Sequence, residues 1–391
     1  MKTIQLYIIL SFLLLNIQAQ EKYPVKPPGT IVAYNPASTG KYLGSPSICI
    51  LPDGSYLAAH DFFGKKTSED ESVIYKSTDK GKSWKEIARL RQFWSALFVH
   101  KGSVYFIGTI QAHNNYVIRK STDGGYTWTA PTDENTGIIV KGKFHCAPTP
   151  IVEHNGRLWR ALEDAEGGTE WPKRYGAFLI SASVDSDLLK AESWTRTQAV
   201  WYNESFLNHE FKGWLEGNAV IDKNGQVANL IRVHTLSKDK EYAAIIHAKA
   251  NGNVSFNPSK DFIDLPGGSK KFTVRYDNQT KRYWTLVNYV PEAYRGKEQM
   301  DRIRNTLVLC SSTDLLHWDI HSRLLFHPDY KKHGFQYADW VFDGKDIIFL
   351  SRTAYDDAEG GAQNYHNTNY ITFHRIKKIK KEQKRLIKII K

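Results

Sequence analysis

The sequence of 391 residues contains little cysteine, only two methionines and no long apolar run after its first twenty residues. Its three cysteines, Cys49, Cys146 and Cys310, are an odd number without paired spacing, so neither a disulfide framework nor a structural zinc site is indicated. No stretch beyond the N-terminal segment has the ~20 apolar residues of a membrane span. The sequence therefore predicts neither a disulfide-stapled nor a membrane-spanning protein.

The first segment has the parts of a secretory signal. Lys2 gives a positive start, Ile4–Leu15 is a short apolar run, and Ala19 supplies a small residue near its end. We therefore predict a signal peptide over residues 1–19 and an exported protein, periplasmic or secreted, without a transmembrane segment.

The formal net charge of +12 lies mostly in the C-terminal tail. Residues 376–391 carry a net +7, and loss of Lys2 with the signal leaves about +4 for the body. A short basic tail is more typical of a solvated chain end than of a reader of phosphates. We predict a basic C-terminal extension over residues 376–391 and no nucleic-acid partner.

Aromatic residues are abundant, with 11 Trp, 21 Tyr and 18 Phe. Flat aromatic side chains fit a pleated, half-buried surface better than a helix, and helical periodicity is nearly absent outside the two ends of the chain. The composition therefore favours an all-β fold.

A sequence repeat gives the most specific structural signal. Residues 77–84 and 121–128 share the pattern S-x-D-x-G-x-x-W, 44 residues apart, and residues 312–318 form a degenerate copy. A stretched fourth version runs from Ser183 to Trp194. Asp accepts hydrogen bonds from turn amides, Gly supplies a positive φ, and Trp folds back as an apolar plug. We interpret the repeats as structural turns.

The period of 40 to 60 residues predicts a β-propeller of four-stranded blades. About 370 mature residues at roughly 50 per blade give about seven blades, with six larger blades as the alternative. No linker interrupts the array. We therefore predict a single β-propeller catalytic domain over residues 24–375.

The repeats resemble the Asp boxes, or BNR repeats, of the sialidase superfamily, where they lie on blade turns away from the active site. Sialidases carry an Arg-Ile-Pro motif on the first blade, which supplies one of three arginines for the substrate's carboxylate. Here Gly44–Ser47 precedes Ile48–Gly54, without an arginine. The resemblance thus implies the propeller fold but argues against sialidase activity.

More of the chain is similar to the propeller ulvan lyases and the related rhamnosyl-glucuronate hydrolases, which act on links between rhamnose and uronic acid. The similar segments are 44–47, 59–64, 144–148, 214–218, 274–277 and the stretch 334–375. This resemblance implies a partner that is an acidic, uronate-containing and possibly sulfated oligosaccharide or polysaccharide.

Three histidines are candidate catalytic groups, because imidazole titrates near neutral pH. His60 ends a strand-like run before two aromatic residues and a Gly, and the resemblance to the hydrolases places their central catalytic histidine there. His145 precedes a segment stiffened by two prolines, and His113 lies in a loop-like run. Either could remove a proton next to a carboxylate, and each could instead be a surface or strand-end histidine.

Arginine would neutralise a uronate carboxylate, because a fixed guanidinium stabilises an enolate-like intermediate. The candidates are Arg160, Arg232 and Arg275, of which we favour Arg275. Strand alternation sends Arg275 and Tyr276 to opposite faces. Tyr202 is then a candidate proton donor to the leaving oxygen, with aromatic packing as its structural alternative.

The segment Trp214–Asn218 offers an aromatic plane for a sugar ring, with Glu216 and Asn218 as polar groups. A Trp and a Gly so close together are equally typical of a blade edge. No H-x-x-x-H or C-x-x-C spacing identifies a metal site, so no cofactor is certain and a structural divalent metal is left open.

Three functions follow. We favour β-elimination at a uronate, in which a histidine removes the C5 proton and Arg275 or Arg232 holds the carboxylate. The leaving group is a sugar in a lyase or water in a dehydratase, and the product is an unsaturated uronate. The first alternative is an α-L-rhamnosidase hydrolysing rhamnosyl-glucuronate links through His60. The second is a non-catalytic glycan-binding propeller. The carboxylate pair of most glycosidases cannot be picked out among the scattered Asp61, Glu163, Asp164, Glu216 and Asp339.

Overall fold

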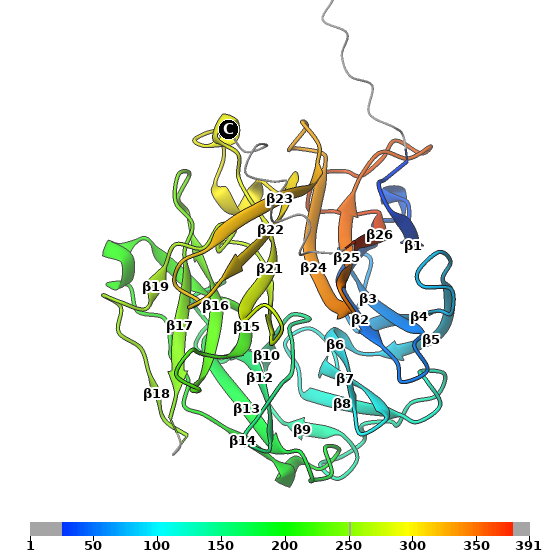
Figure 1. The fold of residues 1–391 in the computed structure, drawn as a ribbon, viewed down its shortest axis with the longest axis vertical. Coiled ribbons are helices and arrows are strands. Elements are labelled where there is room, and N and C mark those ends of the chain that lie inside the picture. The colour runs from blue at the N-terminus through cyan, green and yellow to red at the C-terminus, as the bar shows by residue number, and fades with distance from the viewer. Residues whose placement is uncertain (1–25, 250–251, 378–391) are drawn as a thin grey trace, which may run out of the picture.

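The computed structural model describes residues 26–249 and 252–377. Their strands form six antiparallel sheets, arranged as blades around a central axis (Figure 1). The predicted signal peptide and nearly all of the predicted basic extension lie outside the described residues. None of the helices in the described part of the chain has the length and hydropathy of a bilayer span.

The blades follow one another in chain order, each built from the axis outward. The first consists of β2 (Tyr42–Ile50), β3 (Tyr56–Phe63), β4 (Glu71–Ser77) and β5 (Lys85–Arg91), and the second of β6 (Phe93–His100), β7 (Ser103–Thr109), β8 (Tyr116–Ser121) and β9 (Ile138–Val140). The third consists of β10 (Phe144–His145), β11 (Val152–His154), β12 (Arg157–Asp164), β13 (Gly176–Ser183) and β14 (Trp194–Arg196).

The fourth blade consists of β15 (Phe211–Ile221), β16 (Val227–Thr235), β17 (Ala243–Ala248), β18 (Val254–Ser255) and β19 (Phe262–Ile263), and the fifth of β20 (Thr273–Asp277), β21 (Arg282–Asn288), β22 (Thr306–Ser312) and β23 (Asp319–Phe326). The sixth consists of β24 (Gly334–Asp343), β25 (Asp346–Ala354), β26 (Tyr370–Ile376) and β1 (Thr30–Tyr34). Short 3₁₀ helices occupy the connections: η1 (Ala37–Thr39), η2 (Ala191–Ser193), η3 (Phe206–His209), η4 (Glu292–Tyr294) and η5 (Met300–Arg302).

The blade count corrects the sequence-based expectation of seven. The first two blades keep the short period of the repeat, but later blades carry long connections, such as residues 197–210 and 289–305. These connections enlarge the average blade, so a division by roughly 50 residues overestimates the number of blades. The ring is closed by β1, which pairs with β26 and completes the last blade with the beginning of the chain.

The sequence repeats form the turns between the third and fourth strands of their blades. In the second copy, Asp123 accepts hydrogen bonds from the amides of Tyr126 and Thr127, and the Ser121 hydroxyl accepts one from the Gly125 amide. The first copy repeats this pattern around Asp79. Polar side chains therefore take the place of a regular backbone ladder at these turns.

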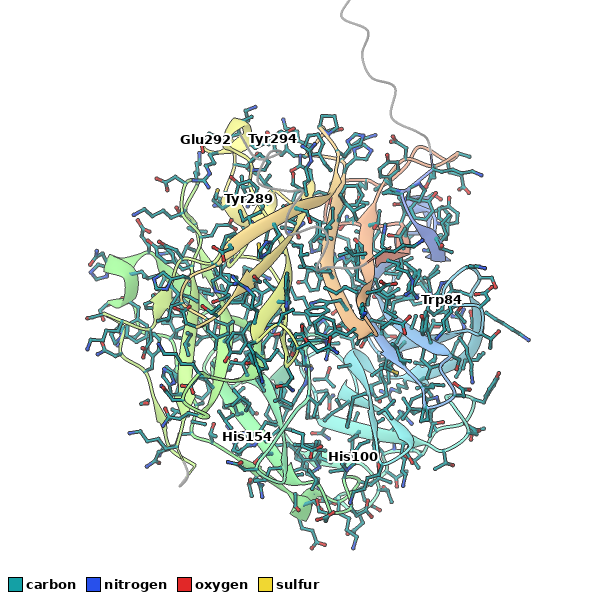
Figure 2. The ribbon with its side chains drawn as sticks, in the orientation of Figure 1. Trp84, His100, His154, Tyr289, Glu292 and Tyr294 are labelled. Carbon is teal, nitrogen blue, oxygen red and sulfur yellow. The ribbon has the colours of Figure 1, made fainter. Side chains whose placement is uncertain are left out.

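The tryptophans of the repeats pack between neighbouring blades. Trp84, marked in Figure 2, lies 5.4 Å from Phe373 of the sixth blade, measured between ring centroids. Trp128 packs into the apolar layer between the first and second blades, and Trp318 into the layer between the fourth and fifth. The core is accordingly a ring of such layers, which leaves the inner ends of the blades free to line a central site.

Candidate active site

The innermost strands enclose a cavity of about 220 Å³ near the end of the axis at which β2, β6 and β24 begin. Five blades supply its walls, so no single segment of the sequence forms it. Its ionisable lining residues are Asp61, Glu69, His145, Glu216, Arg232, Tyr337, Arg352 and His366.

Four of the innermost strands carry a β-bulge at this cavity. Register shifts interrupt the pairing of β2, β6, β15 and β24. Each bulge holds one non-glycine residue with a positive φ: Ser45 at 32°, Trp94 at 51°, Glu216 at 58° and Tyr337 at 55°. All four residues line the cavity. A bulge re-aims a side chain, and backbone strain of this kind, about 1–3 kcal/mol per residue, concentrates at functional sites.

Arg232, Glu216 and Tyr337 form a buried hydrogen-bonded chain. Arg232 Nη1 donates to Glu216 Oε2 at 2.7 Å, and the Tyr337 hydroxyl donates to Glu216 Oε1 at 2.5 Å. Burial alone would raise the pKa of Glu216, but the Arg232 guanidinium and its other partners outweigh burial and lower it to about 2. Glu216 is therefore a carboxylate at neutral pH, with the phenol proton of Tyr337 directed at it.

Two further arginines surround the Tyr337 ring. The guanidinium carbon of Arg352 lies 4.8 Å from the ring centroid of Tyr337, and that of Arg304 lies 5.8 Å from it. Arg352 is buried and donates to neutral groups, the Thr368 hydroxyl and the His366 carbonyl. Among the described residues no ion pair involves Arg352, although burial of an unpaired cation is costly. Asp61 and Glu216 act on its charge only from beyond ion-pair distance, so its guanidinium makes the cavity suitable for an anion.

Asp61 also lines the cavity and is almost fully buried. Its Oδ2 accepts the backbone amide of Trp94 at 2.8 Å, whereas its Oδ1 has no hydrogen-bond partner within the described chain. Burial raises the pKa of Asp61 to about 6, despite the opposing effect of the Trp94 amide. Asp61 is thus about half protonated near pH 6 and can act there as a general acid.

His145 reaches the cavity from the third blade. Its Nδ1 lies 2.8 Å from Glu163 Oε2, and its ring packs against Trp94 and Tyr175 with centroid separations of 4.6 and 4.7 Å. A carboxylate at Nδ1 fixes the ring orientation and leaves Nε2 for another partner. His113 lies behind it, 6.3 Å away between centroids.

The remaining predicted histidine, His60, does not line the cavity. Its Nδ1 is 3.0 Å from the Asp61 carbonyl, and its ring stacks on Tyr75. Burial lowers the pKa of His60 to about 4, so its proton-transfer capacity near neutral pH is small.

Two predicted arginines are bound elsewhere. Arg160 is fully buried and donates to the Tyr116 hydroxyl and the Ala147 carbonyl. Arg275 donates to the Trp340 carbonyl at 2.5 Å and lines a different cavity. The preference for Arg275 over Arg232 is therefore not supported by position, since the Trp340 carbonyl and the Asp339 carboxylate, at 3.6 Å, already engage its guanidinium.

Three other predicted residues serve packing and backbone pairing. Trp214 has no exposed surface and stacks on Phe262, so it presents no face to a sugar. Asn218 accepts the Val274 amide and donates to the Phe272 carbonyl, which joins the fourth and fifth blades. Tyr202 stacks on Phe211 in the same aromatic cluster as Trp214.

Sequence reasoning missed Tyr337, Arg352 and Trp171 as site residues. Trp171 lies in the connection between β12 and β13 and lines the cavity with 55% of its surface exposed. It offers the exposed aromatic surface that Trp214 lacks, although its ring also contacts His234 at 4.9 Å between centroids. Tyr337 and Arg352 lie within the similar stretch 334–375, but nothing there singled them out, because the bulge that aims Tyr337 and the ring closure that brings in Arg352 are properties of the folded chain.

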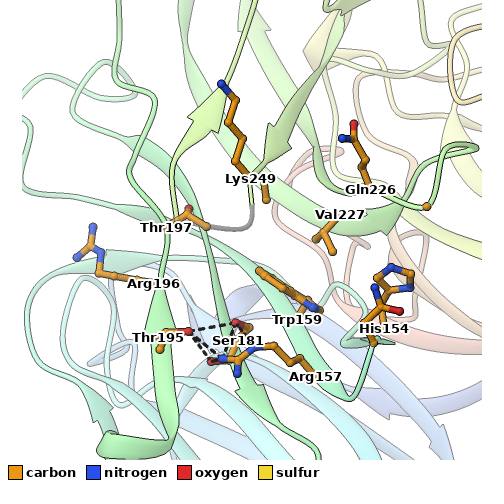
Figure 3. Close-up of a pocket in the computed structure, with 14 residues that line it drawn as sticks. His154, Arg157, Trp159, Ser181, Thr195, Arg196, Thr197, Gln226, Val227 and Lys249 are labelled. Atoms are coloured by element: carbon orange, nitrogen blue, oxygen red, sulfur yellow. Dashed lines mark hydrogen bonds between the residues drawn. The ribbon is translucent and has the colours of Figure 1, made fainter.

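A larger cavity of about 820 Å³ opens on the opposite side of the propeller, between the third and fourth blades (Figure 3). Arg157, Trp159, Arg196 and Lys249 are among its lining residues, and Arg157 donates to the Ser181 hydroxyl. No carboxylate lines it within the described chain. His154 lines it, but it lacks the carboxylates that the smaller cavity assembles.

Comparisons with known proteins identify the fold. No family model and no curated protein matches the chain. Among solved structures, an α-L-arabinanase of Penicillium chrysogenum complexed with arabinobiose is similar at 14% identity and a TM-score of 0.54, over 89% of this chain and 97% of that one. The microbial sialidase Hz136 is similar at 13% identity and a TM-score of 0.59, over 90% of this chain and 69% of that one. A protein of unknown function from Dyadobacter fermentans is similar at 13% identity and a TM-score of 0.57, over 89% of this chain and 99% of that one.

At these identities the similarity shows the β-propeller fold alone. It does not test the resemblance to the ulvan lyases.

Proposed function

We propose that the protein is a carbohydrate-active enzyme that hydrolyses a glycosidic bond beside a carboxylate-bearing sugar. The observation that carries this proposal is the buried chain from Arg232 through Glu216 to Tyr337, in a cavity that also holds Asp61. The hydrogen-bonded residues Arg232, Glu216 and Tyr337 supply an activated nucleophile, and Asp61 supplies a general acid. Similarity to propellers that include an arabinanase and a sialidase agrees with this class of substrate.

The proposed first step is a displacement at the anomeric carbon. The Tyr337 oxygen forms a bond to that carbon as its proton passes to Glu216, and the bond to the leaving oxygen breaks as that oxygen takes the proton of Asp61. Water then attacks the glycosyl–tyrosine bond with Asp61 as the base, and the phenol regains its proton from Glu216. Arg232 and the other nearby arginines stabilise the negative charge that develops on the phenol oxygen.

A neutral phenol suits a substrate whose reacting carbon lies near a carboxylate. A carboxylate nucleophile would repel the substrate's own charge, whereas Tyr337 carries no charge before the reaction. Arg352 is buried without an ionic partner in the described chain and is available for the substrate's carboxylate by a charge-assisted hydrogen bond. The exposed face of Trp171 is placed to pack on a sugar ring.

Products distinguish this proposal from the alternatives. We would incubate the purified protein with fluorogenic glycosides of sialic acid, glucuronic acid and glucose, and with a rhamnose–glucuronate oligosaccharide, and weigh the products by mass spectrometry. The proposal predicts cleavage of an acidic glycoside with gain of one water and little cleavage of the glucoside. Equal cleavage of neutral and acidic glycosides, or no cleavage of any acidic substrate, would overturn it.

A β-elimination at a uronate is the second candidate, and the pairing of His145 with Glu163 favours it. His145 would remove the C5 proton, and Arg232 or Arg352 would offset the carboxylate charge. Rhamnose–uronate chains of the ulvan type are the substrates to test, and an exported enzyme would meet them outside the cytoplasm. An unsaturated product that absorbs ultraviolet light, without gain of water, would favour this candidate over hydrolysis.

A further inference from the structure

A second cluster of ionisable residues lies where the fifth blade passes into the sixth. His327 and His333 lie in the connection from β23 to β24, and Asp356 follows the end of β25. The pairing of Gly334 with Ala354 in the β24–β25 hairpin brings the two segments together. One ligand atom from each of the three residues lies within 4.8 Å of the others.

His333 carries the strongest sign of a missing partner. Its side chain is 5% exposed, and neither ring nitrogen makes a hydrogen bond within the described chain. Nδ1 lies 3.6 Å from Asp329 Oδ2 and Nε2 lies 3.3 Å from Asp356 Oδ2, without hydrogen-bond geometry. The ring of His327 stacks on it at a centroid separation of 3.5 Å, and Nδ1 of His327 accepts the Asp329 amide at 3.1 Å, so an ion would bind His327 through Nε2. Buried imidazole nitrogens seldom remain without partners, so this arrangement calls for a ligand.

We propose that His327, His333 and Asp356 bind one Zn²⁺ ion. Two imidazoles and one carboxylate are ligands that zinc prefers, whereas calcium and magnesium prefer oxygen ligands throughout. Both histidines are buried, and the Asp356 side chain is 44% exposed, which gives an ion access from solvent. Water completes the coordination in this proposal, and the carboxylate of Asp329, 3.6 Å from Nδ1 of His333, would hold the orientation of that ring.

The zinc would tie two connections together next to the cavity described above. His333 directly precedes β24, whose bulge holds Tyr337. Tyr355 contacts both His333 and Phe335, with centroid separations of 5.1 and 6.1 Å. A metal at this position would therefore hold the start of β24 and so support the placement of Tyr337, whether or not the proposed hydrolysis is correct.

Metal content and affinity test the proposal independently of activity. The full-length, tag-free protein is stripped with a chelator and titrated with ZnCl₂ by calorimetry, and dialysed samples are measured by elemental mass spectrometry. His333→Ala and the conservative Asp356→Asn are the test variants. His317→Ala is the matched control, because His317 forms an exposed pair with Asp314 at 2.8 Å on a blade turn.

The expected result is about one Zn²⁺ per chain, a higher melting temperature with zinc than without, and affinity at least roughly tenfold weaker in both test variants but not in the control. If the wild-type protein binds no zinc, if it binds calcium in preference to zinc, or if both test variants bind as tightly as the wild type, the assignment is overturned. None of these outcomes bears on the cleavage chemistry proposed above.

Discussion

Replacing Glu216 by Gln tests the reasoning about the buried chain most fully. Gln keeps the size of the side chain and an oxygen that can accept the Tyr337 hydroxyl, but it removes the negative charge. The Arg232 guanidinium, whose side chain is 4% exposed, then loses its ionic partner at 2.7 Å. The phenol of Tyr337 loses the base that receives its proton.

The two losses have different magnitudes. Breaking a buried ion pair by removing one partner costs about 3–5 kcal/mol of stability. Gln keeps only one of the two hydrogen bonds, because its NH₂ group cannot accept from the Arg232 guanidinium, so we expect no relief from that cost. Loss of a positioned base lowers kcat by about 10²- to 10⁴-fold. The catalytic loss should persist under conditions in which the variant is fully folded.

A chemically similar chain at the other end of β24 provides the control. Asp343 accepts the Tyr56 hydroxyl at 2.5 Å and pairs with Arg375 at 2.8 Å, as Glu216 does with its tyrosine and arginine. Asp343→Asn should therefore reduce stability and leave kcat unchanged. Denaturant unfolding gives the stabilities and a fluorogenic acidic glycoside gives the rates. Full activity in folded Glu216→Gln, or an equal loss of kcat in both variants, would refute the reasoning.

Four further predictions concern other residues. Because the pKa of Asp61 is about 6 and its acid form is required, kcat/KM should fall about tenfold per pH unit above pH 6. Asp61→Asn should lose most of the activity and also this fall of kcat/KM at high pH. A rate that instead rises with pH would favour an imidazole base. Arg352→Met should weaken the binding of acidic substrates roughly tenfold or more, without weakening the binding of a neutral sugar, as measured by calorimetry. Trp171→Ala should raise KM with little change in melting temperature. Asp123→Ala should lower the free energy of unfolding by roughly 1 kcal/mol and leave kcat unchanged, since it removes only turn hydrogen bonds; a large activity loss would contradict this.

The propeller fold could be predicted because its signals are local. The Asp, Gly and Trp of residues 121–128 act within one turn and against one neighbouring blade, so their pattern is readable in the sequence. The number of blades depends on the lengths of the connections, which the repeat does not encode. The structure has six blades, and the expected seven were wrong.

The candidate site could be predicted only in part. Glu216, Arg232 and His145 were singled out from the sequence, and they share one cavity. Tyr337 and Arg352 could not be recognised, because a β-bulge aims the one and closure of the ring brings in the other. Strand alternation separated Arg275 from Tyr276 but could not choose between Arg275 and Arg232, because it gives the face of a side chain and not the blade position at which the cavity lies.

The most direct measurement of the central claim is the mass of the Tyr337 peptide after reaction with a fluorinated acidic glycoside, which forms a glycosyl–enzyme slowly and releases it more slowly. The account predicts a peptide heavier by one fluorosugar, with the label on the Tyr337 oxygen and no label in Tyr337→Phe. An unlabelled Tyr337 peptide despite turnover, or a label on another side chain, would contradict it.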